Sequence, residues 1–264
     1  MAHATVKFES TVNSAIGQPP CPVCMAATSL VDVVDLNKSC EEERASLLPI
    51  AGVPIQYTLC DDCGFCFAPE MCQWSIRDFA TRIYNDDYKL VDPDYLSVRP
   101  RANAQMLTRM FSNHMLDIRH LDYGGGNGEL SRELFAAGWN SMSYDPFVDG
   151  PLRDDLGRFD LVTSFEVFEH VPDVNYLISS LSSLVNADGM VLFSTFLSDG
   201  NIARNQRLNW WYASPRNGHI SLFSRQSLGL LGEKEGLKLV SCSANLHAYW
   251  RDIPSWAVDV FKPA

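Results

Sequence analysis

Two pairs of cysteines with the spacing C-x-x-C are the residues whose types and positions most directly suggest a chemistry. They are Cys21 with Cys24 and Cys60 with Cys63. Each pair can ligate one side of a tetrahedral metal ion, and four thiolates make a closed zinc site with no open position for catalysis. The alternatives are plain buried cysteines and a thioredoxin-type redox centre, which would need one such pair, at the start of a helix. We therefore expect these four cysteines to bind a structural zinc ion.

The chain has 8 cysteines, and the other four are less suited to this site. Cys66 follows Cys63 closely and could compete as a ligand, Cys40 and Cys72 are less well placed, and Cys242 is expected in the core. Disulfides are rare in reducing compartments. Paired cysteines in a cytosolic chain therefore favour metal binding over disulfide formation.

Composition and charge limit the partners of the chain. It carries 21 basic and 32 acidic residues, for a net charge of −11. Proteins that bind phosphate backbones normally present a basic surface, so a nucleic-acid partner is disfavoured and a small-molecule substrate is expected. The N-terminus lacks the basic and apolar segments of a signal peptide, and no run of about 18 apolar residues could cross a membrane. These features predict a cytoplasmic protein without a membrane partner.

A glycine-rich segment between an expected strand and an expected helix is the second candidate site. Residues 121–128 read LDYGGGNG. Glycines at such a turn let the backbone approach a ligand closely, although a plain surface turn would use them too. The dinucleotide fingerprint G-x-G-x-x-G would need a glycine at position 129, which is Glu129. The observed pattern is instead D-x-G-x-G-x-G, which begins at Asp122.

Two further segments follow this one in the chain. Asp145 comes at the end of the next expected strand, where a carboxylate could accept both hydroxyls of a ribose. It could equally cap a turn before Pro146. Residues 159–173 read FDLVTSFEVFEHVPD, an apolar strand that leads into an acidic turn.

In this order, the three segments resemble the motifs of class I S-adenosylmethionine-dependent methyltransferases, and the resemblance covers about residues 118–196. It implies that the glycine loop wraps the amino-acid part of S-adenosylmethionine, that the second acid binds its ribose, and that the end of the third segment's strand lies beside the sulfonium. The cofactor-binding residues implied in this way are Asp122, Gly124, Gly125, Gly126, Asp145, Pro146, Phe165 and Glu166.

Methyl transfer to oxygen or carbon usually needs a base, and two histidines are candidates. His170 lies in the E-H-V turn of the third segment, and His219 lies in a later segment that in these enzymes commonly builds the substrate side; either could instead be a structural histidine. Glu166, Glu169 and His170 also resemble an E-x-x-E-H arrangement that binds metal in some quinone-pathway O-methyltransferases, but that is structural in most relatives.

A wall of the substrate pocket is expected from Trp210, Trp211, Tyr212 and Arg216. The two tryptophans could instead simply pack a lid onto the core.

The elements that must position these residues can be placed from hydrophobic periodicity. Helices are expected at 101–115, 129–137, 174–186 and 225–235, and strands at 118–123, 141–144, 159–165, 190–196, 237–242 and 244–250. This alternation predicts an α/β fold with a parallel sheet. By resemblance the sheet is Rossmann-like and seven-stranded, in the order 3-2-1-4-5-7-6 with the last strand antiparallel.

One spacing departs from the family pattern. Only 13 residues separate Asp145 from Phe159, which is short for a helix and a third strand. The loop that in relatives contacts the adenine is therefore expected to be shortened, and either Asp154 or Asp155 could take over that contact.

The chain is expected to divide into a zinc-ribbon-like lobe with its connector, residues 1–95, and a methyltransferase domain, residues 96–264. This combination resembles sugar C-methyltransferases, and also ribosomal-RNA methyltransferases in which a zinc lobe contacts RNA. We expect O- or C-methylation of a small molecule. The alternatives are an rRNA or tRNA methyltransferase whose zinc lobe docks RNA, and a non-catalytic regulatory module that holds the cofactor.

Overall fold

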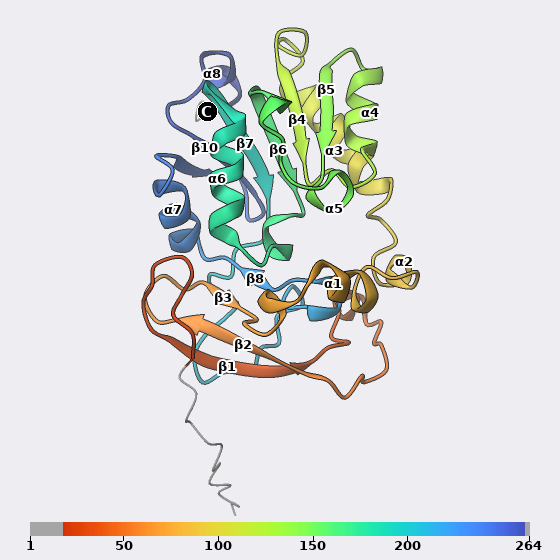
Figure 1. Cartoon of the computed structure of the whole chain (residues 1–264), viewed down its shortest axis with the longest axis vertical. Helices are drawn as coiled ribbons and strands as arrows, with labels where there is room; N and C mark the ends of the chain where they lie inside the picture. The colour runs from red at the N-terminus through yellow and green to blue at the C-terminus, as the bar shows by residue number, and fades with distance from the viewer. Residues whose placement is uncertain (1–17, 262–264) are drawn as a thin grey trace, which may run out of the picture.

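A six-stranded sheet forms the centre of the larger part of the molecule (Figure 1). The computed structural model describes residues 18–261, apart from the side chain of Asp154. The strands are β4 (Arg119–Tyr123), β5 (Asn140–Tyr144), β6 (Phe159–Phe165), β7 (Val185–Ser194), β9 (Lys238–Ser241) and β10 (Leu246–Trp250). They are arranged in the order β5-β4-β6-β7-β10-β9. The first four are parallel to one another, and β10 is antiparallel to both of its neighbours.

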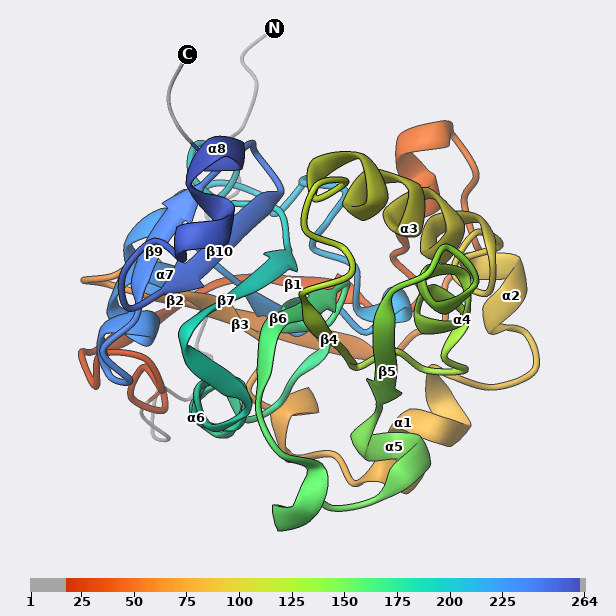
Figure 2. The same ribbon diagram turned by 90° about the horizontal axis from the view of Figure 1, so that it is seen from above.

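Helices cover both faces of this sheet because successive residues of its central strands bury apolar side chains on opposite sides. On one face Leu161 and Leu192 pack with α3 (Val98–Met110) and α4 (Glu129–Ala136). On the other face Val162 and Phe193 pack with α6 (Val174–Leu184) and α7 (Arg225–Glu233). Figure 2 shows α3 and α6 on opposite sides of the strands. A short α8 (Val258–Phe261) follows the last strand.

The expectation of seven strands is wrong by one. The segment between β5 and β6 forms only α5 (Pro146–Asp149) and a 3-10 turn, η3 (Asp154–Leu156). The segment is too short to form both a crossover helix and a further parallel strand, so β5 is the edge strand on this side. The remaining order equals the family pattern without its third strand, and the expected antiparallel strand is confirmed as β10.

A smaller lobe lies next to the carboxyl ends of the parallel strands (Figure 1). Its antiparallel sheet has the order β1-β2-β3-β8, with β1 (Thr28–Asp35), β2 (Pro54–Cys60), β3 (Cys66–Phe67) and β8 (Ser221–Leu222). Around it lie η1 (Cys40–Arg44), η2 (Met71–Gln73), α1 (Ile76–Arg82) and α2 (Tyr88–Val91). Ser75 and Asp78 form a capping box that starts α1.

The lobe draws on two distant parts of the chain. The strand β8 comes from residues 221–222 and pairs with β3. Residues 208–222 also add buried side chains to the lobe's core, among them Leu208, Tyr212 and Ile220. The lobe and the larger sheet are therefore joined by the segment that follows β7 as well as by the one that precedes α3.

The predicted helices all occur, with shifted ends. The first begins and ends a few residues earlier than expected, at Val98 and Met110. Cys242, which we expected in the core, is exposed in the turn between β9 and β10. Within residues 18–261, no helix combines the length and the apolar character that a membrane crossing requires.

Candidate cofactor-binding site and cysteine cluster

The glycine loop connects β4 to α4 in a tight turn. A Cβ atom on Gly125 would overlap the Asp122 carboxylate and the Ser143 hydroxyl, and one on Gly124 would overlap the side chain of Val167. Only glycine fits such close approaches. The loop is thus pressed against the ends of β5 and β6, at the edge where ligands bind in sheets of this kind.

Asp122 lies at the base of this loop and is 4% exposed. Its Oδ1 accepts a hydrogen bond of 3.0 Å from the Thr163 hydroxyl, which lies 2.9 Å from Nε2 of the buried His120. Burial raises the pKa of Asp122 to about 7, and the nearby Asp145 adds to this effect. A carboxylate in such a place is well suited to hold a cationic group, because a positive charge restores its ionised form.

Asp145 ties the glycine loop to the end of β5. Its two carboxylate oxygens accept hydrogen bonds of 2.8 Å from the backbone N–H groups of Gly126 and Phe147. The second bond caps α5, so the capping role that the sequence left open does occur. Each carboxylate oxygen can accept a further bond, which leaves capacity for ribose hydroxyls. Pro146 follows as the first residue of α5.

Phe165 is the last residue of β6, and Glu166 follows it directly. Glu166 has a φ of 56°, in the left-handed region that a glutamate seldom adopts. Ser194 holds it there: its hydroxyl accepts from the Glu166 N–H at 2.8 Å and donates to Oε1 at 2.9 Å. The other carboxylate oxygen lies 3.7 Å from the Arg99 guanidinium.

The two candidate histidines come together with a buried glutamate. One ligand atom from each of Glu169, His170 and His219 lies within 4.8 Å of the others. Glu166 is not part of this group, so the E-x-x-E-H set is not assembled as the sequence pattern suggested. Oε1 of Glu169 accepts a 2.6 Å bond from the Tyr212 hydroxyl, and burial raises the glutamate's pKa to about 8.

Both imidazoles are neutral at pH 7. Burial lowers the pKa of His170 to about 4, and burial together with His170 lowers that of His219 well below its usual value. Nδ1 of His219 lies 2.8 Å from the carbonyl oxygen of Tyr212, and Nδ1 of His170 lies 3.2 Å from that of Gly218. Because a carbonyl only accepts, Nδ1 carries the proton in each ring and Nε2 keeps its lone pair.

The aromatic segment expected as a substrate wall is mostly interior. Trp210 and Tyr212 are buried in the lobe's core, and the guanidinium of the buried Arg216 donates to the Ile83 carbonyl oxygen at 2.9 Å. Trp211 is half-buried and packs edge-on against Phe196. Trp210 therefore matches the packing alternative, and the buried Tyr212 and Arg216 are likewise interior.

The four paired cysteines form one cluster between the lobe and the larger sheet. Their sulfur atoms all lie within 4.8 Å of one another, with 3.6 Å between Cys21 and Cys63 and 3.3 Å between Cys24 and Cys60. The Cys60 sulfur also accepts hydrogen bonds from the backbone N–H groups of Asp62 and Cys63. Cys66, by contrast, is buried in β3 outside this cluster.

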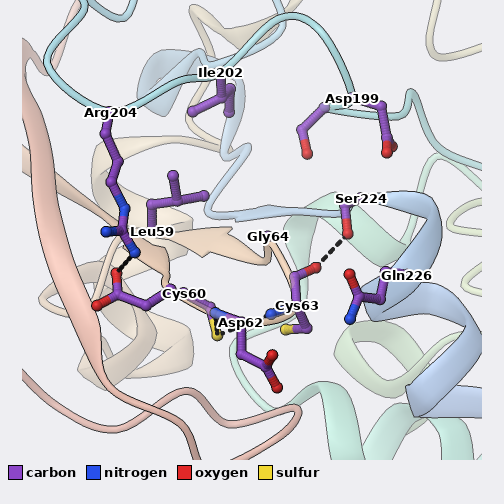
Figure 3. A pocket seen from close by; sticks show the side chains of 12 residues that line it. Leu59, Cys60, Asp62, Cys63, Gly64, Asp199, Ile202, Arg204, Ser224 and Gln226 are labelled. Carbon is purple, nitrogen blue, oxygen red and sulfur yellow. Dashed lines mark hydrogen bonds and ion pairs between the residues drawn. The ribbon is translucent and has the colours of Figure 1, made fainter.

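The cluster is bonded to helices of the larger sheet. The Ser224 hydroxyl, which caps α7, donates to the Cys63 carbonyl oxygen (Figure 3). On the other side the Asn175 amide of α6 donates to the Pro22 carbonyl oxygen at 2.9 Å. A cleft of about 410 Å³ runs beside Cys60 and Cys63 and is bordered by Asp199 and Arg204, away from the glycine loop.

Two residues near the glycine loop and the candidate histidines could not be predicted from the sequence motifs. Ser194, at the end of β7, gave no sequence signal because serines are common at strand ends. Tyr84 lies in the aromatic-rich segment after α1, and its hydroxyl is 3.2 Å from Nδ1 of His170. The density of aromatic residues in that segment was the only signal for it.

Comparison with known proteins gives the family. A family model described as a methyltransferase domain matches residues 95–242. The ubiquinone biosynthesis O-methyltransferase of Colwellia psychrerythraea is 31% identical over 107 residues, covering 31% of this chain and 44% of that protein. The protein of the same name from Bordetella avium is 43% identical over 101 residues, covering 29% and 42%. The chain thus spans less than half the length of these curated relatives.

Solved structures with a similar arrangement are more distant. DesVI of Streptomyces venezuelae has a TM-score of 0.44 at 14% identity, covering 66% of this chain and 98% of DesVI. The 1,6-didemethyltoxoflavin-N1-methyltransferase of Burkholderia thailandensis has a TM-score of 0.47 at 15% identity, covering 72% and 95%. The family match, which extends over more than half of the residues, decides the assignment: the chain belongs to the S-adenosylmethionine-dependent methyltransferases.

Proposed function

We propose that the protein transfers a methyl group from S-adenosylmethionine to an oxygen or carbon atom of a small molecule. The observation that carries this proposal is the convergence of the glycine loop and Asp145 at one edge of the sheet, where the Gly126 N–H donates to the Asp145 carboxylate at 2.8 Å. The sulfonium supplies a methyl group already activated for in-line displacement, so the protein has to bind, orient and deprotonate.

Each part of the site has a role in this proposal. The Asp122 carboxylate and the loop from Gly124 to Gly126 hold the methionine part of the cofactor. Asp145 accepts from the ribose hydroxyls, with Pro146 beside it. Phe165 and Glu166 border the sulfonium, and Ser194 keeps Glu166 in the backbone conformation that places it there.

His170 and His219 are our candidates for the base. Both imidazoles are neutral and keep a lone pair on Nε2, as a general base requires. The side chain of His170 is 17% exposed, whereas His219 is buried, so His170 is the one that an acceptor can reach. His219 packs against it with 4.9 Å between ring centroids and orients it.

A small, uncharged or cationic acceptor suits the charge of the protein. The net charge of −11 works against a polyanion such as RNA. The curated relatives are named as O-methyltransferases of ubiquinone biosynthesis, which supports an oxygen acceptor. Of the aromatic segment, Trp211 is the side chain exposed enough to contribute to a substrate wall.

The cysteine cluster is proposed to hold one structural zinc ion. Sulfur atoms at the corners of a tetrahedron, about 2.3 Å from zinc, lie about 3.8 Å apart. The observed separations of 3.3 and 3.6 Å and the backbone N–H groups directed at Cys60 fit this donor set. The zinc would stabilise the contact between the lobe and the methyltransferase domain. We propose that the domain boundary lies near residues 95 and 96, and that the later segment 208–222 also belongs to the lobe.

The experiment that tests the cofactor site compares two helix-capping aspartates. Asp145→Ala and Asp173→Ala each remove an N-cap, so both should lose roughly 1 kcal/mol of stability. Only Asp145→Ala should lose affinity for S-adenosylhomocysteine, by about tenfold or more in calorimetry. Equal affinity in the two variants would refute the ribose contact.

A further inference from the structure

The lobe reaches the cofactor edge at a place where the methyltransferase domain is incomplete. Beyond β5 the sheet has no further strand among the described residues, and residues 145–158 contribute only α5 and η3. The wall that a third strand and its loop would provide is therefore absent from this side of Asp145. Figures 1 and 2 both show α1 of the lobe beside α5 at this position.

Apolar side chains are left exposed at the same place. Phe147 and Val148 of α5 are 54% and 67% exposed, although they follow Asp145 directly in the chain. Tyr84 of the lobe is 38% exposed and meets Phe147 edge-on, with 6.4 Å between ring centroids and 64° between planes. Two aromatic rings, one from each part of the molecule, thus border the region next to the ribose-binding carboxylate.

Tyr84 is held firmly in this position. Its ring packs against Phe79 and Tyr88, at 6.5 and 5.0 Å between centroids, and its hydroxyl lies 3.2 Å from Nδ1 of His170. A Cβ atom on Gly218 would come within 2.9 Å of that hydroxyl, so only glycine leaves room for it there. A ring fixed at both ends loses little conformational freedom when a ligand packs against it.

We propose that Tyr84 of the lobe, together with Phe147, forms the wall against which the adenosine of S-adenosylmethionine packs, in place of the missing third strand. A purine is flat and aromatic, and packing against aromatic side chains is a sequence-independent way to bind it. Burial and the neighbouring carboxylates raise the pKa of Tyr84, so its hydroxyl stays protonated. This inference rests on the proposed function, and it makes the lobe part of the cofactor site.

The test measures nucleoside binding to the full chain by calorimetry. The probes are S-adenosylhomocysteine and 5′-methylthioadenosine, which keeps the nucleoside but lacks the amino acid. Tyr84→Leu and Phe147→Ala should each weaken both probes by about tenfold. Tyr84→Phe, which keeps the ring, should retain most of the affinity. Phe135→Ala is the matched control, because Phe135 is 71% exposed on α4 and takes no part in the wall.

The outcomes separate this inference from the function on which it rests. If the wild type binds and both Tyr84→Leu and Phe147→Ala bind as tightly, the aromatic wall is refuted and the cofactor assignment stands. If the wild type binds neither probe, both fall. Because Phe147 is exposed, Phe147→Ala tests the wall even if Tyr84→Leu does not fold, and a thermal melt identifies that case.

Discussion

Asp122 is a carboxylic acid enclosed between strands, with one hydroxyl as its hydrogen-bond donor. Its pKa is about 7 in the folded protein, whereas an unfolded aspartate ionises near pH 4. Between these values the folded chain holds a proton that the unfolded chain has lost. The stability that this group contributes is therefore present at low pH and is lost as the pH rises through about 7.

Asp122→Asn should remove this pH dependence. The difference in the free energy of unfolding, variant minus wild type, should increase by about 2–4 kcal/mol when the pH is raised from about 5 to about 8.5. Urea denaturation at the two pH values measures the change. A difference between the two proteins that is the same at both values would contradict the assignment of a raised pKa to Asp122.

At this scale the sequence predicted which residues gather at the site, but not their environment. The spacing of Asp122, the glycines and Asp145 placed them at successive strand ends, and the structure brings these strand ends together. The pairing of His170 with His219 could not be predicted, because the two lie far apart in the chain and only the packed lobe brings them into contact. Their roles in binding and catalysis remain predictions.

The turn between β4 and α4 passes so close to neighbouring side chains that a residue with a Cβ atom would overlap them. Gly125 faces the Asp122 carboxylate and the Ser143 hydroxyl with no room for a side chain. Gly229, in contrast, lies inside α7, where a Cβ atom would have no other group within 4 Å. The turn therefore requires a glycine at position 125, whereas α7 does not require one at position 229.

Gly125→Ala should lower the free energy of unfolding by about 1–3 kcal/mol, because overlapping atoms force the loop away from β5. Gly229→Ala should raise it by about 0.5–1 kcal/mol, because alanine is the better helix former. Chemical denaturation of both variants gives the comparison. A Gly125→Ala protein as stable as the wild type would show that the loop is not packed tightly against these side chains.

At the scale of elements, periodicity predicted the helices and strands around the site because each has one buried face. It could not predict β8, since a strand of two residues has no period and pairs with β3 more than a hundred residues earlier. The short spacing between Asp145 and Phe159 indicated that the third strand could be absent. The expected count of seven strands came from the family resemblance, and the sheet has six.

At the scale of the whole molecule, the cysteine cluster lies at the contact between the lobe and the larger sheet with its helices. Cys21, Cys60 and Cys63 belong to the same hydrophobic core as side chains of α6 and α7, and hydrogen bonds from both helices reach the cluster. A metal held there would stabilise the junction between lobe and sheet as well as the lobe itself. Sequence spacing predicted that these four cysteines come together, which the structure shows, but it could not predict this location, which depends on the docking of the two parts.

With the proposed zinc ion held by the four sulfurs, Cys60→Ser should lower both the metal content and the thermal unfolding temperature of the whole chain, because metal-binding free energy is also folding free energy. Cys242→Ser is the control, since that thiol is exposed and outside the cluster. Metal content by atomic emission and the unfolding temperature are the readouts. Metal retained in full by Cys60→Ser would rule out the four-sulfur site.

The glycine loop and Asp145 are proposed to bind a sulfonium nucleoside in a chain that also carries one zinc ion. A native mass spectrum of the full chain with added S-adenosylmethionine tests this most directly. We predict a species that is heavier than the chain by one zinc ion and one S-adenosylmethionine, and a smaller fraction of nucleoside-bound chain in Asp145→Ala. A chain that takes up a nicotinamide dinucleotide instead, or no nucleoside at all, would contradict the proposal.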